Sequence, residues 1–140
     1  MTRTNTFKYA PAPWASALHL LLLLAALGLF LGRTLAWLRL PPLLALDPGF
    51  YSHVSNFSIS FLLCAGVGQS WLLLGVPLRK VLWLALAIAL VNVVYEGFIP
   101  LLNTRDWIDA LYGVAGTLLA TLWLGVQART LRRLPAANTD

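Results

Sequence analysis

The sequence predicts an all-α polytopic membrane protein, a four-transmembrane-helix bundle with both termini in the cytoplasm. Three observations predict this fold. Of the 140 residues, 59% are hydrophobic and only 11% are charged, whereas soluble domains carry about 25% charged residues. The apolar residues fall into four runs, each long enough to cross a hydrocarbon core of about 30 Å. The basic residues gather at the ends of these runs, which is typical of membrane topology.

The four runs are expected to form a single domain over residues 1–140. Their predicted spans are about 14–38, 53–76, 81–100 and 110–127. The first run begins at Trp14 and is longer than the apolar region of a secretory signal peptide, which is roughly 7–15 residues. We expect this helix to continue through Arg33, whose side chain would snorkel, to about Leu38. Pro41 and Pro42 then stop the helix, and an Asp-Pro-Gly turn follows before the second span.

The basic residues predict the orientation of the chain. With the N-terminus inside, seven of them lie on the cytoplasmic side: Arg3, Lys8, Arg79, Lys80, Arg129, Arg132 and Arg133. Three lie on the outer side: Arg33, Arg39 and Arg105. The positive-inside rule therefore places both termini in the cytoplasm. Topology and lipid headgroups account for the net charge of +5, so we expect the bilayer as a partner and no nucleic acid.

The stretch from Asn92 to Gly116 carries an acid, Glu96, near the end of the third apolar run. A carboxylate at the centre of a span costs about 2.5–3.5 kcal/mol on insertion scales, and less towards the edge. The nearest candidate to compensate it is Arg105 in the connector that follows. An ion pair between Glu96 and Arg105 would either close the helical hairpin or take part in binding a ligand, and both interpretations stay open.

Helical spacing shows which residues of each span share one face of the helix. One stripe in the third span holds Ala85, Ala89, Asn92 and Glu96, and one in the fourth holds Asp109, Gly113, Gly116 and Ala120. Small residues let membrane helices approach closely, so we expect these two stripes to face each other. In the second span, His53, Asn56, Ser60 and Cys64 share a face. A GxxxG motif from Gly28 to Gly32 suggests a further helix contact.

These faces predict a polar pocket that opens on the outer side. Its expected ligand-binding residues are Asp47, His53, Asn56, Asn92, Glu96, Arg105 and Asp109. Asp106 is expected to cap the fourth helix, because an acid suits a helix N-terminus. We expect no cofactor and no metal, because Cys64 is the only cysteine and the two histidines lack a dense ligand spacing.

The segment from Glu96 to Gly116 resembles the VanZ-like family of small membrane proteins. Glu96 and Arg105 keep that family's nine-residue separation, and Asp109 and Gly116 keep its Asp-to-Gly spacing of seven. Asp47 and His53 correspond to an Asp and a His that the family has before its second span. The chain departs from the family pattern at Ile99, where Gln is common, and at Gly113, where Asn is common. The resemblance implies a protein of the bacterial cell envelope with a part in susceptibility to glycopeptide antibiotics.

Three functions fit these patterns. The first is a non-catalytic protein of the bacterial cytoplasmic membrane whose outer pocket binds the headgroup of an envelope lipid or glycan. The second is a small membrane enzyme, with Glu96 or His53 as general base and Arg105 stabilising an anion. The third is a proton or ion relay, which would need a homo-oligomer because only Glu96 lies within a span. The absence of a serine or cysteine nucleophile motif favours the first.

Overall fold

The computed structural model describes residues 7–98 and 106–135. Four long helices dominate it: α1 (Pro13–Gly32), α3 (Phe50–Leu73), α4 (Leu78–Phe98) and α5 (Trp107–Ala128). All four are long and apolar enough to cross a membrane. The predicted all-α fold with four candidate transmembrane helices is therefore confirmed, and it fits a multi-pass membrane protein.

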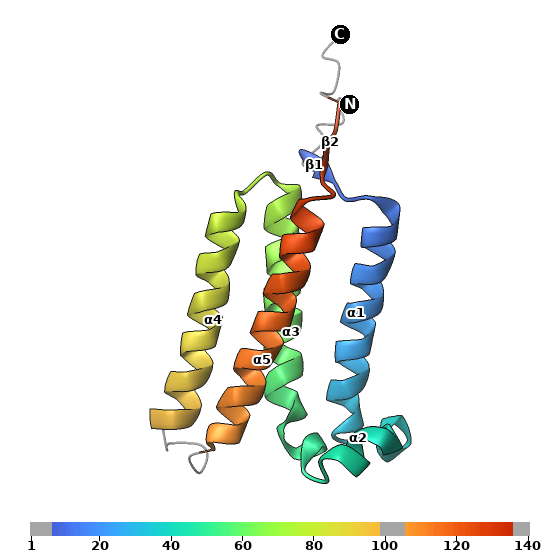
Figure 1. The fold of residues 1–140 in the computed structure, drawn as a ribbon, viewed down its shortest axis with the longest axis vertical. Helices are drawn as coiled ribbons and strands as arrows, with labels where there is room; N and C mark the ends of the chain where they lie inside the picture. The colour runs from blue at the N-terminus through green and yellow to red at the C-terminus, as the bar shows by residue number, and fades with distance from the viewer. Residues whose placement is uncertain (1–6, 99–105, 136–140) are drawn as a thin grey trace, which may run out of the picture.

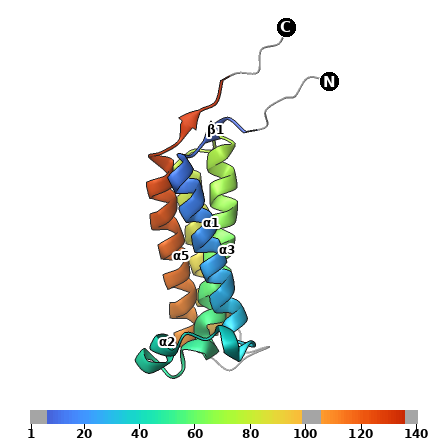
Figure 2. The same ribbon diagram turned by 90° about the vertical axis from the view of Figure 1, so that its right-hand side faces the viewer.

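The four helices lie side by side, with α3 and α5 as a central pair (Figure 1). Helix α5 packs along α3 over much of its length, and α4 packs against both of them. Helix α1 packs mainly on α3. The two views place α1 and α4 on opposite sides of the α3–α5 pair (Figures 1 and 2). Helix α1 is also linked to α5, because Trp123 Nε1 of α5 donates a hydrogen bond to His19 Nδ1 of α1 over 2.9 Å.

Small residues allow the close helix contacts, but they divide between two neighbours. A Cβ at Gly113 would clash with the side chain of Asn92 on α4, as expected from the two facing stripes. A Cβ at Gly116 would instead clash with the backbone carbonyl of Phe57 on α3. The expectation that the whole α5 stripe faces α4 is therefore wrong. Helix α5 lies between two partners. Gly113 and Gly116 point about 60° apart around its axis, so each can face a different neighbour.

The first helix ends earlier than expected, at Gly32 rather than near Leu38. The Arg39 side chain folds back and donates hydrogen bonds to the carbonyl oxygens of Gly32 and Arg33, each over 2.9 Å. These bonds satisfy carbonyls that have no partner inside the helix, so Arg39 closes α1. In the GxxxG motif, only Gly32 lies close to another helix, against the ring of Tyr51, and Gly28 has open space around it.

The connector after α1 contains a short 3₁₀ turn (Ala36–Leu38) and a short helix, α2 (Pro41–Leu46). Pro41 and Pro42 occupy the first positions of α2, where a missing N–H is harmless. The prolines thus begin a helix as well as preventing α1 from continuing. The starts of α3, α4 and α5 lie three residues before the expected positions. The predicted end of the third span at Pro100 lies outside the described residues.

The two ends of the described chain meet at one end of the bundle (Figure 1). Strand β1 (Tyr9–Ala10) pairs antiparallel with β2 (Arg132–Arg133), and Lys8 N donates to Leu73 O over 2.9 Å. Gly75, at φ +85°, makes the turn between α3 and α4 at this end, where its lack of a Cβ removes the strain. Helix α2 and the first turns of α3 and α5 lie at the opposite end, which we call the polar end.

Large apolar side chains cover the outside of the long helices. The exposed ones include Leu20, Leu24, Trp83, Leu90, Leu118 and Leu122. So much exposed apolar surface would be unfavourable in water, whereas contact with lipid chains carries no such free-energy cost.

The predicted orientation can be tested with two exposed positions, Ala45 in α2 and Pro77 in the turn between α3 and α4. In a Cys64→Ala background, Ala45→Cys is expected to react with a membrane-impermeant thiol reagent in intact cells. Pro77→Cys should react only after the cells are lysed, because the basic residues around it favour the cytoplasm. Labelling of Pro77→Cys in intact cells would show that the turn between α3 and α4 lies outside, and the predicted orientation would be reversed.

Candidate functional site

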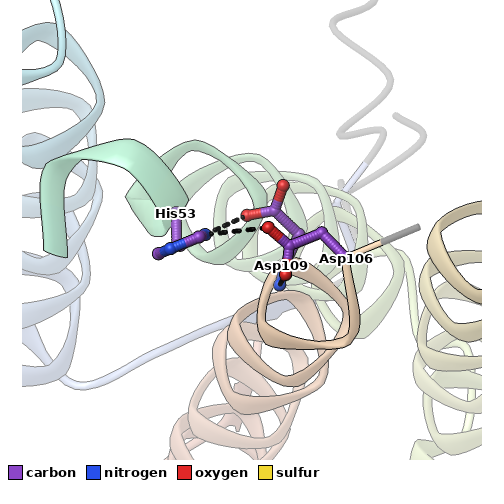
Figure 3. Close-up of side chains that lie close together, drawn as sticks. All are labelled: His53, Asp106 and Asp109. Carbon is purple, nitrogen blue, oxygen red and sulfur yellow. Dashed lines mark hydrogen bonds and ion pairs between the residues drawn. The ribbon is translucent and has the colours of Figure 1, made fainter. Parts of the chain in front are cut away.

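Three ionisable side chains meet at the polar end (Figure 3). His53 Nδ1 lies 2.8 Å from Asp109 Oδ1 and 3.6 Å from Asp106 Oδ2. The side chains of His53 and Asp109 are 18% and 14% exposed, and that of Asp106 is 31% exposed. The cluster is therefore partly covered by the helices and partly accessible at the polar end.

Local helix structure holds these residues in place. Asp106 is the N-cap of α5, and its Oδ1 accepts hydrogen bonds from Ile108 N over 2.9 Å and Asp109 N over 3.4 Å. This is the capping role expected for Asp106 from the sequence. Asp109 lies in the first turn of α5, where an acid suits the positive end of the helix dipole. His53 lies in the first turn of α3, so the cluster joins the beginnings of two packed helices.

Asp47 is connected to the same region through Tyr112. Tyr112 Oη donates to Asp47 Oδ2 over 2.9 Å, and Gly49 N donates to Asp47 Oδ1 over 2.8 Å. The rings of Tyr112 and His53 lie 5.7 Å apart. Sequence reasoning missed Tyr112, although it lies three residues after Asp109 and so shares its helix face.

Glu96 and Asn56 form a second contact between helices near this end. Asn56 Nδ2 of α3 donates to Glu96 Oε1 of α4 over 3.0 Å. Glu96 is only 6% exposed. Its second carboxylate oxygen, Oε2, is buried and has no hydrogen-bond partner among residues 7–98 and 106–135. Arg105 lies outside the described residues, so the expected ion pair between Glu96 and Arg105 stays a prediction.

Asn92 lies one turn further into the bundle, where it bonds to its own helix and to α3. Its Nδ2 donates to Ser60 Oγ and to Ile88 O, both over 2.9 Å. Ser60 Oγ lies 3.3 Å from Asn92 Oδ1, and Gly113 packs against the same amide. These contacts engage both ends of the amide, so Asn92 joins three helices below the polar end.

The carboxylates of the chain are concentrated at this end. Of its five acidic residues, Asp47, Glu96, Asp106 and Asp109 lie in the polar-end contacts, and Asp140 lies outside the described residues. Two arginines of the α1–α2 connector make other contacts: Arg33 Nη1 donates to Ser55 Oγ over 3.0 Å, and Arg39 bonds the end of α1. Within the described part of the chain, the ionic contacts of these acids are those of Asp106 and Asp109 with His53. The arrangement can accept hydrogen bonds or bind a cation.

An apolar cleft lies beside the polar contacts, between α1, α3 and α5. Its lining includes Leu29, Phe57 and Leu119. Phe57 lies four residues after His53 and so shares its face of α3, which places the cleft on the His53 side of the bundle, away from Glu96 on α4. The polar end and this cleft together could accommodate a molecule with a polar head and an apolar tail.

No protein-family model matches the chain, and neither the curated proteins nor the solved structures contain a match to it.

Proposed function

We propose that this chain is a non-catalytic, VanZ-like protein of the bacterial cytoplasmic membrane whose polar end faces outward and binds the headgroup of an envelope lipid or lipid-linked glycan. The observation that carries the proposal is the state of Glu96. A buried carboxylate whose Oε2 lacks a partner among the described residues has a capacity for a hydrogen bond that a ligand can fill. Buried polar groups in proteins are otherwise nearly always hydrogen-bonded.

The chemistry of the polar end favours a ligand rich in hydrogen-bond donors. Ionised carboxylates only accept hydrogen bonds, and they bind hydroxyl, amide and ammonium groups. Asp47, Glu96 and Asp109 supply such acceptors on three different elements. Sugar hydroxyls and amino headgroups match this set better than a bare phosphate does.

The apolar cleft supports a ligand that carries an acyl or polyprenyl chain. A chain lying against Leu29, Phe57 and Leu119 would place the headgroup near His53, which lies one turn from Phe57 on the same face of α3. Because the chain of a lipid already lies in hydrocarbon, the cleft would orient the lipid through packing contacts rather than by removing apolar surface from water. The protein would thereby hold an envelope lipid at the outer surface and change how a glycopeptide antibiotic reaches its target.

A deletion strain tests this proposal. We expect loss of the protein to change susceptibility to envelope-targeting antibiotics, and the wild-type gene to restore it. Glu96→Gln keeps the shape of the side chain but removes its charge, so it is expected not to restore the phenotype. Asp140→Asn, which removes the acid of the C-terminal tail, is the matched control and should restore it. Equal amounts of each protein in the membrane must be confirmed by immunoblotting.

Full restoration by Glu96→Gln at equal membrane levels would refute the role of this carboxylate. An unchanged susceptibility profile on deletion would count against the whole proposal.

One contact favours a small membrane enzyme as the second candidate. The 2.8 Å contact between His53 Nδ1 and Asp109 Oδ1 is the arrangement in which a carboxylate orients a histidine base. An enzyme would convert envelope lipids that a binding protein returns unchanged. Incubating the purified protein with envelope lipid extracts, followed by mass spectrometry, separates the two.

A further inference from the structure

We propose that His53, Asp106 and Asp109 form a binding site for a divalent transition-metal ion, with Zn²⁺ as the best fit. The site lies at the polar end but goes beyond the proposed function, because an ion can bind there without any lipid. It also replaces the expectation from the sequence that no metal is bound. Asp106 and Asp109 are neighbours at the start of α5, but His53 joins them only when α5 packs on α3. Local sequence spacing therefore does not predict the site.

The distances between the donor atoms suit one shared ion. One ligand atom from each of the three residues lies within 4.8 Å of the others. His53 Nδ1 is 2.8 Å from Asp109 Oδ1 and 3.6 Å from Asp106 Oδ2. Nitrogen and oxygen ligands bind Zn²⁺ at about 2.0–2.2 Å, which places tetrahedral neighbours about 3.4 Å apart. The observed separations therefore need only small side-chain adjustments.

Asp106 has a carboxylate oxygen that does not take part in capping the helix. Asp106 uses Oδ1 for the backbone N–H groups of α5, so its Oδ2 is turned towards His53. The capping bonds hold that carboxylate still, as ligand-orienting hydrogen bonds do in metal sites. His53 comes from a different helix, so an ion here would link the beginnings of α3 and α5.

Charge balance favours a bound divalent ion over direct contacts between His53 and the two carboxylates alone. Two carboxylates face a single imidazole nitrogen. A hydrogen on Nδ1 can serve Asp109 at 2.8 Å, but Asp106 at 3.6 Å is beyond hydrogen-bond range. A divalent ion balances the two negative charges of the carboxylates.

The donor types select the class of metal. Imidazole suits Zn²⁺ and its transition-metal neighbours, whereas Ca²⁺ prefers six to eight oxygen ligands and Mg²⁺ keeps several waters. A set of one histidine and two carboxylates supplies three protein ligands. This leaves the fourth Zn²⁺ position to water or to an oxygen of a ligand.

The test is a calorimetric titration of the chelator-stripped full chain in detergent micelles with ZnCl₂. We expect saturable binding of one ion per chain. His53→Gln is expected to weaken binding by at least about tenfold, the lower end of what even outer-shell substitutions cause. The matched control is His19→Gln, which removes the other histidine of the chain, on α1, and should leave Zn²⁺ binding unchanged.

Asp106→Asn separates ligand loss from misfolding. Asparagine caps helices about as well as aspartate, so the variant should keep its helical circular dichroism while losing Zn²⁺ affinity. The proposal is overturned if wild-type protein shows no saturable binding, or if folded His53→Gln and Asp106→Asn both bind as tightly as wild type. The titration contains no envelope lipid, so failure of the lipid proposal and failure of the metal proposal are distinguishable.

Discussion

Gly116→Ala is expected to destabilise the bundle by about 1–3 kcal/mol, the usual range for forcing extra atoms into a packed interface. The added Cβ would meet the carbonyl oxygen and neighbouring backbone atoms of Phe57. Backbone atoms of a helix cannot rotate away, so α5 and α3 would have to separate. Since these two helices form the central pair, the loss should affect the whole bundle. Unfolding in mixed micelles with increasing sodium dodecyl sulfate, followed by circular dichroism, measures it.

Two other glycines of α5 provide graded controls. Gly113→Ala meets the Asn92 side chain, which can shift, so its effect should be smaller than that of Gly116→Ala. A Cβ at Gly125 has nothing within 4 Å, and Gly125→Ala should be neutral or stabilising by up to about 1 kcal/mol. Equal stability of the Gly116→Ala and Gly125→Ala proteins would contradict the close approach of α3 and α5.

Glu96→Gln is expected to leave the free energy of unfolding unchanged or to raise it. The glutamine Oε1 can accept the same hydrogen bond from Asn56, and the substitution removes a charge from a site that is only 6% exposed. Residues that serve function at the expense of stability commonly behave in this way. The same micelle titration measures the effect.

A structural ion pair with Arg105 would give the opposite result. Breaking a buried pair by removing one partner destabilises by about 3–5 kcal/mol. Glu96→Gln would then be strongly destabilising, and adding Arg105→Gln would restore stability in the double variant. Such a rescue would assign Glu96 to closing the α4–α5 hairpin and remove the main support for ligand binding.

The sequence alone was sufficient for the number and approximate position of the membrane helices. A span is recognisable because its backbone must satisfy its own hydrogen bonds and its side chains must tolerate lipid, and both are local properties of an apolar run. The role of Asp106 was equally local, because an N-cap bonds to the two or three residues that follow it. The end of α1 was not predictable in this way. It depends on the Arg39 side chain, which bonds to the carbonyl of Gly32 from beyond the next turn.

Only the tertiary structure decided which polar groups meet. Helical spacing placed His53 and Asn56 on one face of α3, but it could not show that His53 contacts Asp109 while Asn56 contacts Glu96. It also could not show that Gly116 faces α3 and Gly113 faces α4. Periodicity defines directions around a single helix axis, whereas the partner in each direction depends on how the helices rotate and pack against one another. The convergence of His53, Asp106 and Asp109 is a product of that packing.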